Sequence, residues 1–139
     1  MWMIQLTNTD SVMIIAIDFD GTCVTHEYPA VGQDIGAVPV LKKLVSCGHK
    51  LVLNTMRSGQ TEQDAVKWFR DNDLPLYGVN KHPTQHTWTS SPKVYANLYI
   101  DDAALGIPLK YDPSISMKSY VDWDAVERLL VERKIIVTA

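Results

Sequence analysis

The chain has 139 residues, of which 46% are hydrophobic and 21% are charged, and this composition predicts a single globular domain with a hydrophobic core. Its formal net charge of −3 gives no general attraction for nucleic acid, so a nucleic-acid partner is not indicated. Cys23 and Cys47 are too few for a disulfide framework and have no partners at metal-ligand spacing. No apolar run approaches the roughly 20 residues that span a bilayer. We therefore expect a soluble, cytoplasmic protein with no membrane partner.

The predicted elements begin at Met13. Residues 1–12 have a mixed composition without a hydrophobic period, so we expect them to be either a disordered N-terminal extension or the product of an upstream start, with Met13 as the natural start. Residues 13–139 are expected to form one core domain without internal linkers or repeats. If Trp2 were ordered and packed into the core, this hypothesis would be wrong.

Strand and helix signals alternate from Met13 onward, which is typical of a mainly parallel sheet covered on both faces. The predicted fold class is therefore a three-layer α/β/α, doubly wound (Rossmann-like) single domain. The strand signals cover residues 13–17, 50–55, 76–79, 97–100 and, as an edge strand, 107–111. The helix signals cover a segment that begins near Ile35 and ends before Gly48, then residues 61–72, and a closing helix capped by Asp122 with Val126, Leu129 and Leu130 on its apolar face.

Two carboxylates follow the first predicted strand, in the sequence Asp18-Phe19-Asp20-Gly21-Thr22. Like charges this close resist joint ionisation, so a buried strand that ends in this way favours a cation or a proton between them. The alternative is a tight turn, because Asp-Gly is common turn chemistry. The pentapeptide alone favours a functional site over a turn.

Other polar residues also follow strands. Thr55 ends the second strand, and Asp101 and Asp102 end the fourth. Because parallel strands present their carboxyl ends at one edge of the sheet, we expect these groups to meet Asp18 and Asp20. A carboxylate cluster of this kind suits Mg²⁺, which prefers hard oxygen ligands. Taken alone, Asp101-Asp102 fits equally well as the cap of the turn that follows it.

Four motifs in this order resemble those of the haloacid dehalogenase-like (HAD) superfamily of phosphatases. The first is an apolar strand followed by Asp-x-Asp-Gly-Thr at residues 14–22, and the second is a strand that ends in Thr55. The third is a lysine, best matched by Lys93, and the fourth is the acidic pair in residues 99–102. The motifs span the chain from residue 13 to residue 102. One departure is Val94, since many relatives have proline after the lysine.

The resemblance implies a catalytic role for each acid. Asp18 would attack phosphorus and form an aspartyl-phosphate, and Asp20 would act as general acid and then general base. Mg²⁺ would be held by Asp18, by the backbone carbonyl of Asp20 and by Asp101, with Asp102 orienting a metal-bound water or joining as a ligand. Cys23 is interpreted as a packing residue and not as a second nucleophile.

The same resemblance implies the phosphate-binding groups. Thr55 would donate a hydrogen bond to the phosphate, and Lys93 would neutralise both the phosphate and the charge of Asp18. Lys81 is the alternative motif lysine, although a solvated loop lysine is the better interpretation of it. Arg57 is a candidate substrate contact, with a solvated side chain near a helix start as an equally good interpretation.

The spacing between motifs leaves no room for the cap domain that many relatives carry, so the resemblance implies a capless enzyme with an open active site. Its substrate would be either a macromolecule-borne phosphate or a small phosphomonoester enclosed by a homo-oligomer. Two other classes remain as alternatives: a phosphoacceptor domain of the receiver type, and a catalytically silent binding domain. The motif order argues against a receiver, whose acidic pair comes first.

Overall fold

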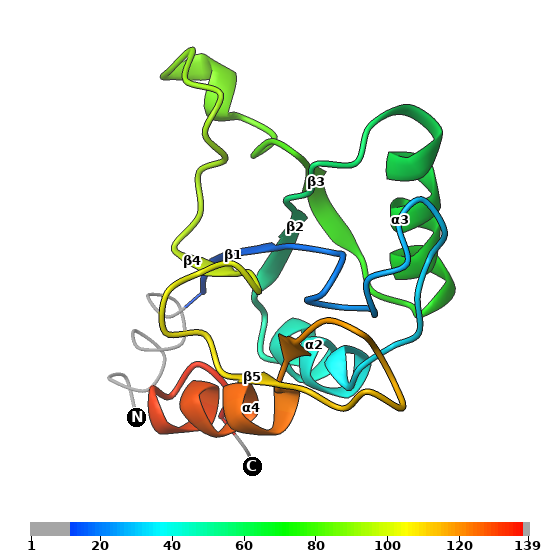
Figure 1. Cartoon of the computed structure of the whole chain (residues 1–139). Helices are drawn as coiled ribbons and strands as arrows, with labels where there is room; N and C mark the ends of the chain where they lie inside the picture. Colours follow the sequence, from blue (N-terminus) through cyan, green and yellow to red (C-terminus); the bar gives the residue numbers. More distant parts are fainter. Residues whose placement is uncertain (1–11, 138–139) are drawn as a thin grey trace.

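Four parallel strands form the central sheet of the computed structural model, in the order β3-β2-β1-β4 (Figure 1). The structure describes residues 12–137, so the prediction for the first residues, including Trp2, lies outside the described part of the chain except at Val12. The elements are β1 (Ile14–Ile17), α2 (Ala37–Ser46), β2 (Lys50–Leu53), α3 (Gly59–Asp71), β3 (Leu76–Val79), η1 (Gln85–Thr87), β4 (Leu98–Ile100), β5 (Leu109–Lys110), β6 (Tyr120–Val121) and α4 (Trp123–Glu132).

The strand order reverses beside β1. From β1 the chain proceeds through α2 to β2 and through α3 to β3, and it then crosses to the other side of β1 to form β4. In open α/β sheets, ligands bind outside the carboxyl ends of the strands at such a switch point. The ends of β1 and β4 are therefore the expected position of a functional site.

The alternation of side chains along the strands divides the core between the two faces of the sheet. Ile15 and Ile17 of β1 belong to the main core cluster, together with the buried residues of α2, α3 and α4. Ala16 points to the opposite face, where it clusters with Val52 and Val94. Val94 and Ala96, which precede β4, therefore pack on the second face, and the only helical part of the segment between β3 and β4 is the short η1.

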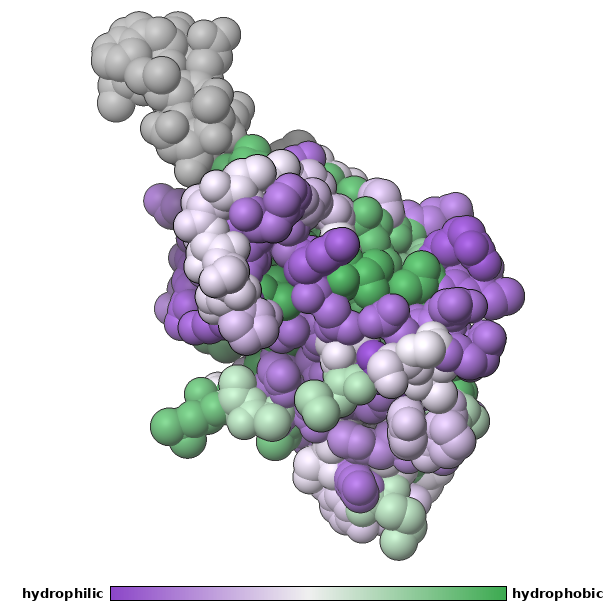
Figure 2. All heavy atoms as spheres, turned by 90° about the horizontal axis from the view of Figure 1, so that it is seen from above, coloured by the Kyte–Doolittle hydropathy of each residue, from purple (hydrophilic) through white to green (hydrophobic). Residues whose placement is uncertain are grey.

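The predicted fold class, a single-domain Rossmann-like α/β protein, is confirmed. The predicted cap of the last helix is also observed, since Asp122 Oδ1 accepts a hydrogen bond of 3.2 Å from the Ala125 amide. None of the helices that the structure describes is long and apolar enough to cross a membrane. The face of the molecule in Figure 2 is mainly hydrophilic, with smaller hydrophobic patches between the polar groups.

One predicted strand belongs to a different sheet. The segment 107–111 was expected to add an edge strand to the main sheet, but β5 pairs antiparallel with β6 in a separate two-stranded sheet. The reason is a long-range contact: the Val121 amide of β6 donates to the Gly21 carbonyl, 3.0 Å away. This contact fixes β6 beside the turn after β1, and β5 pairs with it there. In α4, Val126 and Leu130 are buried, whereas Leu129 is 38% exposed.

Candidate active site

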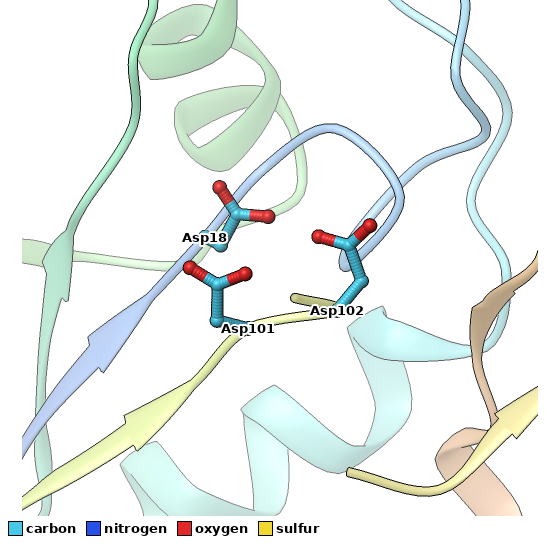
Figure 3. Close-up of side chains that lie close together, drawn as sticks. All are labelled: Asp18, Asp101 and Asp102. Carbon is cyan, nitrogen blue, oxygen red and sulfur yellow. The ribbon is translucent and has the colours of Figure 1, made fainter. Parts of the chain in front are cut away.

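Three carboxylates meet at the switch point between β1 and β4 (Figure 3). Ile17 is paired with Ile100 in the parallel ladder, and the Asp18 amide donates to the Ile100 carbonyl at 3.0 Å. This register brings Asp18 beside Asp101 and Asp102. One carboxylate oxygen from each of the three residues lies within 4.8 Å of the others. Such a group of hard oxygen donors fits a divalent cation.

The electrostatics of this carboxylate triad favour a bound cation. The pKa of Asp18 is raised to about 8, chiefly by burial and then by the hydrogen bond with Asp102 and the negative charges of Asp101 and Asp102, whereas the hydrogen bond from Thr22 opposes this rise. Within residues 12–137, no lysine or arginine forms an ion pair with any of the three carboxylates. A proton or a metal ion is therefore needed to offset the negative charge.

The turn after β1 holds Asp18 and Asp102 together through Thr22. Its fully buried hydroxyl donates to Asp18 Oδ2 at 2.7 Å and accepts a hydrogen bond of 2.9 Å from the Asp102 amide. Gly21 makes the turn possible, because its φ of +79° favours glycine. The indole of Trp123 donates to the Thr22 carbonyl at 2.6 Å and so fixes the turn from α4.

His26 is a residue of this site that sequence reasoning missed. Its Nε2 atom lies 3.3 Å from Asp102 Oδ2, and its ring packs over Gly21, where a Cβ atom would come within 2.2 Å of Nε2. No spacing rule could have found it, because the contact depends on the path of the loop after Thr22. The buried Cys23 thiol donates to the Asp18 carbonyl at 3.3 Å, and burial raises its pKa, which favours a packing role.

The Asp20 carboxylate is bound by Arg57 and is not a member of the triad. Its two carboxylate oxygens accept hydrogen bonds of 2.8 Å from Nε and Nη2 of Arg57. The Arg57 side chain is only 1% exposed, and the hydrogen bonds that it donates to Asp20 raise the pKa of its guanidinium above the usual value. The structure thus brings together two predicted site residues, and Arg57 is not the solvated side chain that was the equal alternative to a substrate contact. Ligation of a metal by the Asp20 carbonyl remains a prediction.

Thr55 is held at the same edge of the sheet by a residue that sequence reasoning did not single out. Asn80, which directly follows β3, accepts a hydrogen bond of 2.8 Å from the Thr55 amide, and its own amide group donates to Glu62 at 2.7 Å. The Thr55 hydroxyl accepts from the Arg57 amide at 3.1 Å. Because a hydroxyl has one proton and two lone pairs, this proton remains available for a ligand. The signal for Asn80 was its position at a strand end.

The two candidate lysines occupy different places. The Lys93 Nζ lies 5.5 Å from the centre of the Tyr99 ring, and Tyr99 is paired with Ala16, which faces the second side of the sheet. The structure therefore does not bring Lys93 into an ion pair with Asp18. Lys81 is exposed and directly follows Asn80 at the end of β3. The assignment of Lys93, with Lys81 as the alternative, stays a prediction.

The fold and this site define a class: a single-domain, Rossmann-like α/β protein with an aspartate triad, able to hold a metal ion, at the carboxyl edge of its sheet. No protein-family model matches the chain, and no curated protein matches it either. A solved structure, described as that of a conserved protein from Bacteroides thetaiotaomicron, is 37% identical in sequence and superimposes with a TM-score of 0.72. The match covers 88% of this chain and 92% of the Bacteroides chain. The chain belongs to the same family as that conserved protein.

Proposed function

We propose that the protein is a capless, Mg²⁺-dependent phosphatase of the HAD-like superfamily, which hydrolyses a phosphomonoester through an aspartyl-phosphate on Asp18. The observation that carries this proposal is the carboxylate triad, which has no lysine or arginine ion-pair partner among the described residues and in which the pKa of Asp18 is raised to about 8. An aspartate nucleophile must be ionised, so this site needs a cation to work near neutral pH.

The donor set fits Mg²⁺. Asp18 and Asp101 would hold the ion through their carboxylates, with the Asp20 carbonyl as a further ligand and Asp102 either ligating or orienting a bound water. When bound, the ion would neutralise negative charge on the carboxylates and on the substrate phosphate. Thr22 supports this arrangement, because its hydrogen bond holds Asp18 in place beside Asp102.

The chain's own residues supply the remaining chemistry. Asp18 Oδ forms a bond to phosphorus as the ester P–O bond breaks, and Asp20 gives a proton to the leaving oxygen. Asp20 then takes a proton from the water that hydrolyses the aspartyl-phosphate, so the enzyme returns to its starting state. The Thr55 hydroxyl accepts a hydrogen bond from the Arg57 amide, so its own proton would be donated to a phosphate oxygen. Lys93 or Lys81 would provide the positive charge.

An open site restricts the substrate to two classes. A single helix, α2, separates β1 from β2, and only α3, β3 and the short η1 lie between Thr55 and Lys93, so neither interval holds a cap domain. The substrate is then either a phosphate carried by a macromolecule or a small phosphomonoester that a homo-oligomer encloses. A phosphoacceptor domain and a silent binding domain on the same scaffold are the alternative functions.

The test uses the purified full chain with Mg²⁺ and a panel of phosphomonoesters that includes phosphosugars, nucleotides, phosphorylated polymers and p-nitrophenyl phosphate. We expect turnover that chelation of Mg²⁺ abolishes and that Asp18→Asn lowers by roughly 10⁴-fold or more. Unchanged turnover in Asp18→Asn would refute the nucleophile. A stable phosphoenzyme without turnover would indicate the phosphoacceptor alternative, and neither phosphoenzyme nor turnover would indicate a binding domain.

A further inference from the structure

Every N–H group of the Arg57 guanidinium can be accounted for by a protein acceptor. Two hydrogen bonds go to Asp20, and the others reach the carbonyls of Pro29, Ala30 and Thr61 at 3.2, 2.7 and 3.3 Å. These five hydrogen bonds equal the number of N–H groups that a guanidinium carries. In this arrangement Arg57 has no donor left for a substrate phosphate.

Packing also immobilises the Arg57 side chain. The guanidinium carbon lies 5.1 Å from the centre of the Phe19 ring and 5.2 Å from that of the Tyr28 ring. Phe19 is fully buried, whereas Tyr28 is 63% exposed, so one ring belongs to the core and the other covers Arg57 from outside. A guanidinium that contacts two rings and three backbone carbonyls offers a rigid surface to its partner.

That partner is Asp20, the proposed proton donor and acceptor. Both of its carboxylate oxygens accept hydrogen bonds from the planar Arg57 guanidinium, one from Nε and one from Nη2. This bidentate geometry selects a single orientation of the carboxyl group. The Asp20 side chain nevertheless remains 21% exposed, so it is accessible from the open edge. Proton transfer requires such a group to be held in a fixed position at the reacting oxygen.

We propose that Arg57 is a positioning residue that fixes the Asp20 carboxyl group for proton transfer with the leaving group, and that it does not bind the substrate phosphate. The inference rests on the proposed phosphatase function, and it replaces the substrate contact that the sequence offered as one of two interpretations of Arg57. Asp20 keeps its orientation through the cycle, because the oxygen that does not carry the proton still accepts a hydrogen bond from Arg57. The proton itself passes from Asp20 to the leaving oxygen and is recovered from water.

The test compares the wild type with Arg57→Lys, which keeps the positive charge but lacks the planar fork. The kcat/KM is measured for a series of phosphomonoesters whose leaving groups range from nitrophenol to simple alcohols. We expect little loss with nitrophenol, which leaves without a proton, and a loss that rises toward about 10²-fold with alcohols, which need general acid catalysis. Inhibition by inorganic phosphate is expected to be unchanged. Arg57→Gln serves as a second variant if the lysine variant fails to fold.

A double-mutant comparison separates positioning from a general structural role. In an Asp20→Asn background, Arg57→Lys should cause no further loss of kcat/KM with alcohol leaving groups, because its target is already absent. An equal loss for all leaving groups, a loss that persists in the Asp20→Asn background, or weaker inhibition by phosphate would overturn the positioning role. Absence of turnover in the wild type would instead overturn the phosphatase function, so the two failures are distinguishable.

Discussion

The buried hydroxyl of Thr22 donates a 2.7 Å hydrogen bond to Asp18 Oδ2. The Thr22 hydroxyl oxygen in turn accepts a hydrogen bond of 2.9 Å from the Asp102 amide. One side chain from the turn after β1 therefore joins the proposed nucleophile to the acidic pair that follows β4. The final residue of Asp-x-Asp-Gly-Thr is thus a connector between two strands, and its loss should affect both.

We expect Thr22→Val to destabilise the fold by about 1–3 kcal/mol, because it leaves the Asp102 amide and an Asp18 oxygen without their partner at nearly constant volume. Urea unfolding followed by circular dichroism measures the change. Thr22→Ser keeps the hydroxyl and is the matched control. Equal stabilities for the valine and serine variants would show that the hydroxyl contributes nothing to holding the two strand ends together.

The raised pKa of Asp18 predicts how stability depends on pH. Between pH 3.8, its ordinary value, and about 8, the folded metal-free chain retains a proton that the unfolded chain has lost. The free energy of unfolding should therefore fall as the pH rises through this window. Asp18→Asn, which does not titrate, should show a shallower decline. Thermal unfolding of both proteins in a chelator, from pH 4 to pH 9, makes the comparison, and parallel curves would contradict the shifted pKa.

Mg²⁺ should reverse this loss of stability, because a cation favours the ionised carboxylates and binds the folded state. At pH 8 we expect the ion to raise the unfolding midpoint of the wild type, but much less that of Asp101→Asn, which removes one member of the triad. We expect the affinity for Mg²⁺, measured by calorimetry, to fall by at least about tenfold in this variant. The exposed Asp124 lies on α4, so Asp124→Asn is the control. An equal response in all three proteins would exclude the triad as the metal site.

Asn80 provides a test of the phosphate side of the site. Asn80→Gly removes the acceptor of the Thr55 amide while tolerating the φ of +56° at this position. Losing one such hydrogen bond, worth about 1 kcal/mol, should weaken inhibition by inorganic phosphate roughly fivefold. Glu62→Gln keeps an acceptor for the Asn80 amide group and should bind phosphate as the wild type does. If the glycine variant also binds phosphate normally, Asn80 does not position Thr55 for the ligand.

The local pattern of the sequence was sufficient for the parallel part of the fold. The runs 13–17 and 50–55 are short and mainly apolar, and the strands within them, β1 and β2, are largely buried, as is typical of a parallel sheet covered on both faces. The run 76–79 forms β3, which lies at the edge of the sheet and is only partly buried. The meeting of Asp18 with Asp101 and Asp102 was also predictable, since parallel strands end at one edge. The β5–β6 pair was not, because two-residue strands carry no periodic signal and depend on the Gly21 contact.

The pairing of side chains within the site was decided by the tertiary structure. Arg57 lies 37 residues from Asp20 in sequence. Whether its guanidinium binds Asp20 or a substrate depends on which hydrogen-bond acceptors surround it in the folded chain. Likewise, the His26 contact with Asp102 and the position of Lys93 over Tyr99 depend on the paths of loops. The periodicity of hydrophobic residues and the positions of strand ends specify the secondary structure and the edge of the sheet at which the polar residues lie. They do not specify the partner of a long polar side chain, because that choice follows from packing and charge in the assembled molecule.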